Sequence, residues 1–218
     1  MGAYTSPAEA GSPRVGRPAL ISARSGPGRA ARLRRHRGQA ADMIMPAATP
    51  TSDATEQTAG RVDVLVNNAG VSGAVESGTQ DPTTLDLEVV RTVLDTNVLG
   101  VVRVTNAMLP LLSRANSPRI VNVSSSMGSL TRQTGPVMAA YAPSKSMLNS
   151  VTAQYARRLT DTNVIVNACC PGYVATDFTG FNAPRTPEQG AAIAVRLATL
   201  PDDGPRGGCF DDEGVVPW

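Results

Sequence analysis

The sequence predicts an α/β fold in which a doubly wound parallel sheet is covered by helices on both faces. Short, continuously apolar segments alternate with longer segments whose apolar residues recur at helical spacing. Strands that are apolar throughout are typical of parallel sheets buried on both faces. Polar motifs follow directly after these segments, and ligands bind at the carboxyl ends of the strands in such sheets. The same edge is therefore the expected place for a functional site.

The predicted strands and helices alternate from residue 61 onward. Apolar runs that stop at polar turns indicate strands, and apolar residues at helical spacing indicate helices. Pro118 ends the first helical pattern, and Pro143 is compatible with a helix only within its first turn. The expected elements are strands over 62–66, 119–123 and 164–170, helices over 84–112, 139–159 and 187–200, and an edge strand over 207–210.

Composition narrows the class of protein. A chain of 218 residues with 41% hydrophobic residues suits one globular domain with a sizeable core. No apolar run approaches the ~20 residues of a membrane span, and residues 1–18 lack the apolar core of a signal peptide. The three cysteines have no metal-binding spacing, and the single histidine argues against zinc sites and Ser-His-Asp triads. We therefore expect a cytoplasmic protein with no metal and no membrane partner.

Lys145 is the only lysine among the 20 Lys and Arg residues of the chain, and it stands four residues after Tyr141. Residues four apart lie on one face of a helix, so the Lys145 ammonium can approach the Tyr141 hydroxyl. A cation at that position favours the phenolate and lowers the phenol pKa from about 10 towards working pH. The pair therefore indicates a general acid/base, although two surface residues at helical spacing would give the same pattern.

Five motifs occur in order along the chain and place this pair in a wider pattern. They are Asn67-Asn68-Ala69-Gly70, Asn97-Val98-Leu99-Gly100, Asn122-Val123-Ser124-Ser125, Tyr141-x-x-x-Lys145 and Pro171-Gly172-x-Val174-x-Thr176. With these motifs the chain resembles the short-chain dehydrogenase/reductase family, and within it the carbonyl-reductase-like members. The resemblance covers roughly residues 51–218. It implies a Rossmann-type fold and an oxidoreductase that uses NADP(H), with NAD(H) not excluded, on a small carbonyl or alcohol.

The resemblance implies four catalytic residues. Tyr141 would give a proton to the substrate oxygen as hydride arrives, or take it in the reverse reaction. Lys145 would lower the Tyr141 pKa and bind the nicotinamide ribose. Ser125 would donate a hydrogen bond to the substrate oxygen, although either neighbouring serine could be confused with it. Asn97 would interrupt its helix and hold a proton-relay water beside the lysine.

The resemblance also implies where the cofactor lies. Small residues after the strand over 62–66 would let the backbone approach the ribose. The turn after the strand over 164–170 would frame the nicotinamide. The implied cofactor-binding residues are Asn68, Ala69, Gly70, Tyr141, Lys145, Pro171, Gly172, Val174 and Thr176. The helices over 84–112 and 139–159 resemble those of the family's dimer interface, which favours a homo-oligomer.

The first 50 residues depart from the family pattern. The family has a strand and then a Thr-Gly-x-x-x-Gly-x-Gly turn, whose amides and following helix bind the pyrophosphate. The nearest match here is 18–28, with Leu20-Ile21 as the strand, Ser22-Ala23 for Thr-Gly, and Gly26-x-Gly28 for the last two glycines. This turn is one residue short, and Pro27 removes a donor. The second strand cannot be placed, so we expect the sheet to be incomplete at its first or second strand. We expect 1–50 to be a poorly ordered Arg/Pro/Gly-rich segment, from a shifted frame or a deletion, and 51–218 to form the Rossmann domain.

Three functions are compatible with these features. The first is a working NADP(H)-dependent reductase or alcohol dehydrogenase. The second is an impaired relative that has lost the pyrophosphate-binding turn and acts as a weak binder or partner subunit. The third is a nucleic-acid-binding module built on the arginine-rich residues 14–37. That segment has no aromatic side chain for base stacking, so nucleic acid is not expected as a partner.

The altered turn generates the first prediction. Because the turn lacks a full set of backbone amides, NADPH should bind weakly. The nearby arginines should contribute mainly by long-range electrostatic attraction of the cofactor's phosphates. We therefore expect affinity to fall steeply as salt is added. Calorimetric titration with NADPH at low and high ionic strength measures this, and tight, salt-insensitive binding would show that residues 18–28 form a proper phosphate-binding turn.

Overall fold

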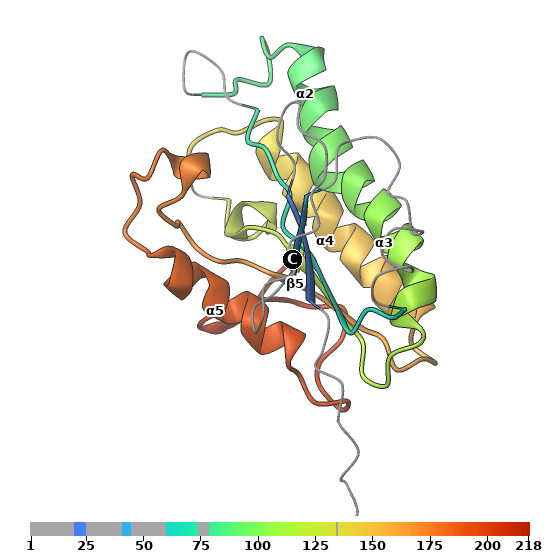
Figure 1. The fold of residues 1–218 in the computed structure, drawn as a ribbon. Helices are drawn as coiled ribbons and strands as arrows, with labels where there is room; N and C mark the ends of the chain where they lie inside the picture. The colour runs from blue at the N-terminus through green and yellow to red at the C-terminus, as the bar shows by residue number, and fades with distance from the viewer. Residues whose placement is uncertain (1–19, 25–40, 45–59, 74–78, 134) are drawn as a thin grey trace, which may run out of the picture.

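The computed structural model describes residues 20–24, 41–44, 60–73, 79–133 and 135–218. In these residues one sheet has the strand order β2-β1-β3-β4-β5-β6-β7, parallel throughout except that β7 runs antiparallel to β6 (Figure 1). This confirms the doubly wound α/β fold. The strands are β1 Leu20–Arg24, β2 Ala41–Ile44, β3 Val64–Asn67, β4 Arg119–Val123, β5 Ile165–Cys169, β6 Cys209–Asp211 and β7 Gly214–Val216.

The N-terminal strands are more complete than the sequence indicated. β1 contains the predicted Leu20-Ile21 strand, and β2 occupies a position that the sequence left open. β1 pairs in parallel with both β2 and β3, so the sheet contains both strands that we expected to be incomplete. β2 has only four residues, too few to show an apolar pattern. It joins the sheet through backbone hydrogen bonds, which do not depend on a particular side-chain pattern. Both strands precede residue 51. Ser22 and Ala23, which we matched to the start of the phosphate-binding turn, lie within β1, because their backbone pairs with that of β3. The rest of that turn and the other residues of 1–50 lie outside the described residues.

Helices cover both faces of the sheet. The helix predicted over 84–112 consists of α2 Leu87–Leu94, a π-helical turn η1 Asp95–Leu99, and α3 Gly100–Leu112. These lie on the same side of the sheet as α4 Tyr141–Arg158, and α5 Pro187–Ala198 lies on the other side (Figure 1). The short 3₁₀ turns η2 Ser126–Gly128 and η3 Asp177–Thr179 follow β4 and β5.

Capping side chains explain where two helices begin. The Asp86 carboxylate accepts a hydrogen bond from the Glu88 amide at 2.9 Å, so α2 starts at Leu87 and not at the predicted residue 84. The Thr186 hydroxyl accepts from the Gln189 amide at 3.3 Å, and the Gln189 side chain accepts in return from the Thr186 amide at 2.9 Å. This capping box fixes the predicted start of α5.

The predicted edge strand at 207–210 is an inner strand of the described sheet. β6 pairs with β5 on one side and β7 on the other, so β7 forms the edge. The turn between them is held by the Asp211 carboxylate, which accepts from the amides of Glu213 and Gly214, both at 3.0 Å. Gly214 has a φ of 131°, which favours glycine there. Three-residue strands leave too little alternation for the sequence to reveal them.

Alternate residues of the strands point to opposite helical layers. Leu65 and Ile120 pack with Met108, Leu111 and Leu112 of α3 in one apolar cluster. Their neighbours Val66 and Val121 pack with Ile193 and Leu197 of α5 in the other. Both faces of the inner strands are thus apolar, as the continuous apolar runs predicted. The core holds the carboxyl ends of β3, β4 and β5 side by side.

Buried amides replace apolar side chains where two inner strands end. Asn67 and Asn122 are paired in the register of β3 and β4, and the Asn67 amide donates to the Asn122 side-chain oxygen at 2.8 Å. The Asn122 amide donates in turn to the Thr152 hydroxyl on α4 at 2.9 Å. Hydrogen bonds to both amide nitrogens and to the Asn122 oxygen offset the cost of burying these groups, whereas the buried Asn67 side-chain oxygen has no partner among the described residues. The chain of bonds fixes α4 against the strand ends.

The close contact between η2 and α4 generates the second prediction. A Cβ atom on Gly128 would lie 2.8 Å from the carbonyl carbon of Lys145 and 2.9 Å from its oxygen, and backbone atoms cannot move aside easily. We expect Gly128→Ala to reduce the free energy of unfolding by about 1–3 kcal/mol, because the added methyl group forces η2 away from α4. Chemical unfolding measures this. Gly135→Ala is the control, because a Cβ there meets nothing within 4 Å, and equal stability of the two variants would contradict the contact.

Candidate active site

The four predicted catalytic residues come from three parts of the fold. Asn97 lies in the π-helical turn η1, Ser125 lies two residues after the end of β4, and Tyr141 and Lys145 lie in the first two turns of α4. The π-helical turn is the helix interruption that the resemblance implied. The structure brings all four to the carboxyl edge of the sheet, where parallel sheets bind ligands.

The Ser125 side chain lies beside the Tyr141 hydroxyl, where it favours the ionised phenol. The neighbouring Ser124 is buried, and its hydroxyl donates to Asn149 at 2.6 Å instead. The structure thereby resolves which serine of the motif contacts the tyrosine. Burial raises the Tyr141 pKa to about 12, and the Ser125 side chain only partly opposes this. The lowering of the Tyr141 pKa that we expected from the sequence is wrong, because desolvation of the phenolate dominates the shift.

Lys145 is buried beneath the tyrosine, with 4% of its surface exposed. Its ammonium donates to the carbonyl oxygen of Val123 at the end of β4, at 2.8 Å, and lies 5.6 Å from the centre of the Tyr141 ring. Burial lowers the Lys145 pKa to about 8. The ammonium and the phenol are neighbours, as the helical spacing predicted. Each pKa is shifted in the direction that favours the neutral form of its group.

Asn97 joins the segment after β3 to α4. Its side-chain oxygen accepts from the Val71 amide at 2.8 Å, and its amide donates to the Val71 carbonyl at 2.9 Å and to the Ser144 hydroxyl at 3.0 Å. Ser144 donates to the Tyr141 carbonyl at 2.6 Å. The side chain of Asn97 thus has protein partners on both ends, and it holds the β3 segment beside the catalytic helix.

The segment after β3 brings the predicted cofactor residues Asn68, Ala69 and Gly70 to this position. Asn68 is exposed, and Ala69 and Gly70 are half-buried. A Cβ on Gly70 would lie 3.5 Å from both the Asn97 side-chain oxygen and the Lys145 nitrogen. The backbone of Gly70 therefore passes directly over the two predicted catalytic residues, and a larger side chain would intrude between them.

The segment after β5 carries the remaining predicted cofactor residues. Pro171 follows the buried Cys170, and Gly172 has a φ of 74°. Val174 pairs with Arg185 through a backbone bridge, and its carbonyl accepts from the Thr179 hydroxyl at 2.6 Å. The Thr176 amide donates to the same hydroxyl at 3.2 Å. The turn is thus held by its own side chains at the carboxyl end of β5.

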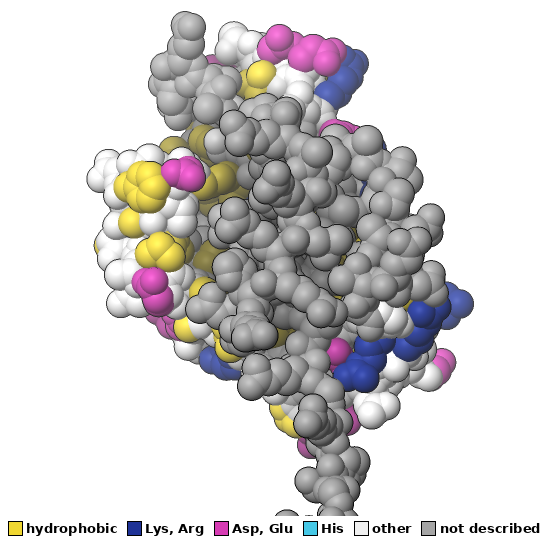
Figure 2. Space-filling model, viewed as in Figure 1, with side chains coloured by type: hydrophobic (Ala, Val, Ile, Leu, Met, Phe, Trp, Pro, Cys, Tyr) yellow, Lys and Arg dark blue, Asp and Glu magenta, His cyan; other side chains and the backbone are white. Residues whose placement is uncertain are grey.

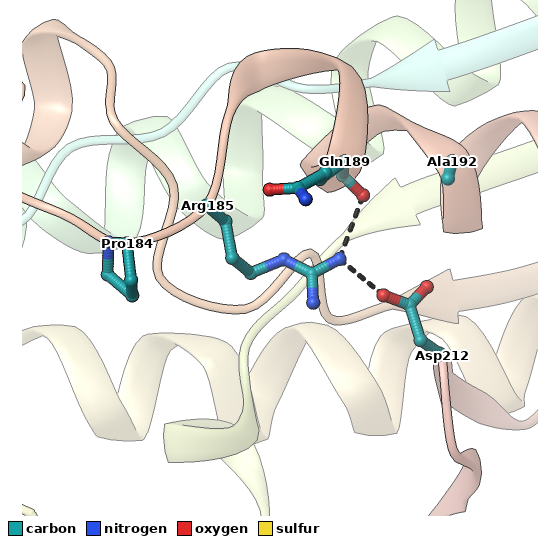
Figure 3. A pocket seen from close by; sticks show the side chains of 5 residues that line it. All are labelled: Pro184, Arg185, Gln189, Ala192 and Asp212. Atoms are coloured by element: carbon teal, nitrogen blue, oxygen red, sulfur yellow. Dashed lines mark hydrogen bonds and ion pairs between the residues drawn. The ribbon is translucent and has the colours of Figure 1, made fainter.

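A hollow of about 450 Å³ lies on the other side of this turn (Figure 3). Arg185 projects into it, donates to the Gln189 carbonyl at 2.8 Å and pairs with Asp212. A Cβ on Gly172 would lie 2.9 Å from the Arg185 side chain, so Arg185 packs against the turn at Gly172. The described residues that line the hollow are Pro184, Arg185, Gln189, Ala192 and Asp212, which include no predicted site residue. The hollow therefore lies next to the site, but its described lining includes none of the predicted catalytic or cofactor-binding side chains.

Two residues at the site were missed by the sequence analysis. The Phe178 ring lies 5.7 Å from the Tyr141 ring, centre to centre. The Gln80 side chain accepts hydrogen bonds from the amides of Ala140 and Tyr141 at 2.9 and 3.2 Å. Phe178 follows the Thr176 motif by two residues, which was an available signal. Gln80 stands in a polar turn between predicted elements, and no local pattern distinguishes it.

Comparison with known proteins places this geometry in a family. Residues 38–186 match the family model described as short chain dehydrogenase. The chain belongs to this family of oxidoreductases. It is 31% identical to short-chain dehydrogenase/reductase 1 of Saponaria officinalis, over 81% of this chain and 76% of that protein. It is also 30% identical to carbonyl reductase (NADPH) 1 of Sus scrofa, over 73% of this chain and 68% of that one.

The solved structures agree with the sequence relatives. Salutaridine reductase of Papaver somniferum is similar with a TM-score of 0.66 and 30% identity, over 78% of this chain and 82% of that one. The predicted membership of the short-chain dehydrogenase/reductase family, with carbonyl-reductase-like relatives, is therefore confirmed. In the described part of the chain, no helix of this dehydrogenase is both long and apolar enough to cross a membrane.

The buried ammonium of this dehydrogenase generates the third prediction. Because burial lowers the Lys145 pKa from 10.5 to about 8, the unfolded chain binds more protons than the folded one between these values. Stability therefore rises with pH across that window, and below it the folded protein carries a desolvation penalty of roughly 3 kcal/mol. We expect Lys145→Met to be more stable than the parent near neutral pH, although it loses a hydrogen bond worth about 1 kcal/mol.

The advantage of Lys145→Met should shrink as the pH rises from about 8 to 10.5, because the parent's lysine then becomes neutral in both states. Chemical unfolding of both proteins without cofactor, across this range, measures the difference. A difference that stays constant with pH would show that the ammonium is well solvated in the folded protein.

Proposed function

We propose that this dehydrogenase is an NADP(H)-dependent reductase of carbonyl compounds in which Tyr141 is the proton donor. The observation that carries the proposal is the position of Tyr141 beside both Ser125 and the buried ammonium of Lys145. A phenol, a hydroxyl and a cation at one strand end can bind, polarise and protonate an oxygen that gains negative charge. The name of the Sus scrofa relative, which specifies NADPH, supports the choice of cofactor.

The residues present fit the nicotinamide end of such a cofactor. Gly70 leaves open the space next to Lys145 and Asn97 that a side chain would fill. Lys145 uses one of its three N–H donors on Val123, which leaves donors for ribose hydroxyls. Pro171, Gly172, Val174 and Thr176 would lie along the nicotinamide, and Asn68 and Ala69 along the ribose. The segment expected to bind the pyrophosphate lies outside the described residues.

Each residue then has a distinct part in the reaction. When bound, NADPH supplies the hydride that adds to the carbonyl carbon. Tyr141 gives its proton to the carbonyl oxygen, so that an alcohol forms and a phenolate remains. Ser125 donates a hydrogen bond to the same oxygen and stabilises its developing charge. Lys145 stabilises the phenolate by its positive charge, and Asn97 holds the β3 segment and α4 at the required separation.

The raised pKa of Tyr141 favours the reductive direction. With a pKa of about 12 the phenol keeps its proton at neutral pH, so it is ready to act as an acid. Alcohol oxidation instead requires the phenolate, which is scarce until the pH is high. We infer that carbonyl reduction is the working direction near neutral pH.

Exposed aromatic side chains in the segment after β5, one of which contacts Tyr141, favour an apolar substrate. Tyr173, Phe178 and Phe181 are 57%, 48% and 66% exposed, and the Phe178 ring contacts the Tyr141 ring. Figure 2 shows hydrophobic side chains gathered on the left, over the segment that carries η3 in Figure 1. Such a surface binds apolar groups by removing them from water. We infer that the carbonyl compound carries an apolar or aromatic group.

Removal of one oxygen atom tests the proposal. We expect Tyr141→Phe to lose nearly all NADPH-dependent carbonyl reduction, on the order of a hundredfold or more, because the proton donor is gone while the ring still packs. Initial rates with a panel of apolar aldehydes and ketones measure this.

The same substitution elsewhere on α4 provides the control. Tyr155→Phe removes a hydroxyl that donates to the Asn106 side chain at 2.7 Å, away from the site, and should keep the parent's rate. An active Tyr141→Phe variant with native circular dichroism would remove Tyr141 from the mechanism.

A further inference from the structure

Gln80 is a buried glutamine whose side chain connects two distant segments. It is 1% exposed, and its amide donates to the carbonyls of Ser72 and Gly73, both at 2.6 Å. Its side-chain oxygen accepts from the amides of Ala140 and Tyr141 at 2.9 and 3.2 Å. A glutamine side chain can donate two hydrogen bonds and accept two, so its capacity is fully used.

The backbone of Gln80 reinforces the connection. Its amide donates to the Val137 carbonyl at 3.1 Å, and its carbonyl accepts from the Ala139 amide at 3.2 Å, in a parallel bridge with Met138. The side chain thus lies flat against the approach to α4. Gly73 has a φ of 69°, and a Cβ there would lie 2.6 Å from Val93 and 2.9 Å from Val89 of α2, as well as 3.2 Å from the Gln80 amide nitrogen, so the segment packs closely here.

The start of α4 needs such a partner. The first backbone N–H groups of a helix have no acceptor within the helix, and a side-chain oxygen at the N-cap usually supplies one. The N-cap of α4 is Ala140, whose methyl group cannot accept a hydrogen bond. Gln80 supplies the acceptor from sixty residues earlier in the sequence, and one of the two amides it binds belongs to Tyr141.

Together with Asn97, Gln80 forms a pair of amide bridges between the segment after β3 and the first turn of α4. Asn97 joins Val71 to Ser144, and Gln80 joins Ser72 and Gly73 to Ala140 and Tyr141. One segment carries the predicted cofactor contacts and the other carries the predicted proton donor. The distance between hydride and proton donor therefore depends on both bridges.

We propose that Gln80 is a positioning residue for Tyr141, which fixes the first turn of α4 relative to the β3 segment so that the phenol stays aligned with Ser125. The role rests on the proposed reductase function. A misplacement of a reacting group by about 1 Å can lower turnover by a factor of about 100. Loss of Gln80 should therefore reduce kcat while leaving the cofactor affinity largely unchanged.

The test compares two substitutions of buried amides by apolar residues of similar size. Gln80→Met removes the bridge. Asn167→Leu is the matched control, because the Asn167 side chain also joins backbone groups, donating to the Pro205 carbonyl at 2.7 Å and accepting from the Gly208 amide at 3.1 Å, on another part of the sheet. Both variants should lose stability. Gln80→Met should lose on the order of tenfold or more in kcat, with the NADPH dissociation constant within about twofold of the parent. Asn167→Leu should keep its kcat.

A second variant separates the two halves of the bridge. Gln80→Glu keeps the acceptor oxygens for α4 but, as a carboxylate, cannot donate to Ser72 and Gly73. Protonation restores one donor, so its kcat relative to the parent should recover as the pH falls. Equal kcat values for Gln80→Met and the control, or a Gln80→Glu deficit that does not change with pH, would overturn the positioning role.

Amide hydrogen exchange tests the bridge without reference to turnover. In Gln80→Met the amides at the start of α4 should exchange faster than in the parent, whereas Asn167→Leu should leave them unchanged. Unchanged exchange would overturn the bridge even if Tyr141→Phe is inactive. If, conversely, Tyr141→Phe keeps the parent's rate, the reductase mechanism is refuted. Amide hydrogen exchange would then still test the Gln80 bridge on its own.

Discussion

Polar groups at the carboxyl ends of β3 and β4, and in the segment after β3, lie in or near the core, and each needs a hydrogen-bonding partner there. Side-chain amides provide several of these partners. Asn67 and Asn122 connect the strand ends to α4, and Asn97 and Gln80 connect the following segment to its first turn. An unpaired buried polar group costs more than most single contacts contribute. The requirement to satisfy these groups therefore determines how the helix that carries Tyr141 is placed.

The electrostatics of the site follow from the same burial. An ammonium and a phenol at helical spacing lead one to expect a stabilised phenolate, but desolvation acts on both groups and disfavours both charged forms. It raises the Tyr141 pKa to about 12 and lowers the Lys145 pKa to about 8. The chain thus holds a protonated phenol beside a cation that is close to losing its proton. Such a site is suited to giving a proton rather than to taking one.

Much of the fold could be predicted from the sequence because its signals are local. The continuous apolar runs predicted β4 to the residue and β5 to within one residue at each end, and the helical pattern over 187–200 predicted the residue at which α5 starts. The four catalytic candidates were named from motifs, and the structure brings them together. The short strands β2 and β7 were not predicted, because so few residues show no periodicity. Gln80 was also not predicted, because its partners are about sixty residues away and no local pattern records a long-range hydrogen bond.

All but one of the Lys and Arg residues of this chain are arginines, and the one lysine lies at the base of the site. This has a consequence for covalent modification of the protein. Ubiquitin and acetyl groups are attached to lysine side chains. The only such side chain in this sequence is 4% exposed and bonded to the end of β4. Lysine-directed modification of the folded chain therefore has no accessible side chain to act on, and an acyl group found on Lys145 would report that α4 had opened. Acylation located at Lys145 by an amine-reactive reagent thereby becomes a probe of local unfolding at the site.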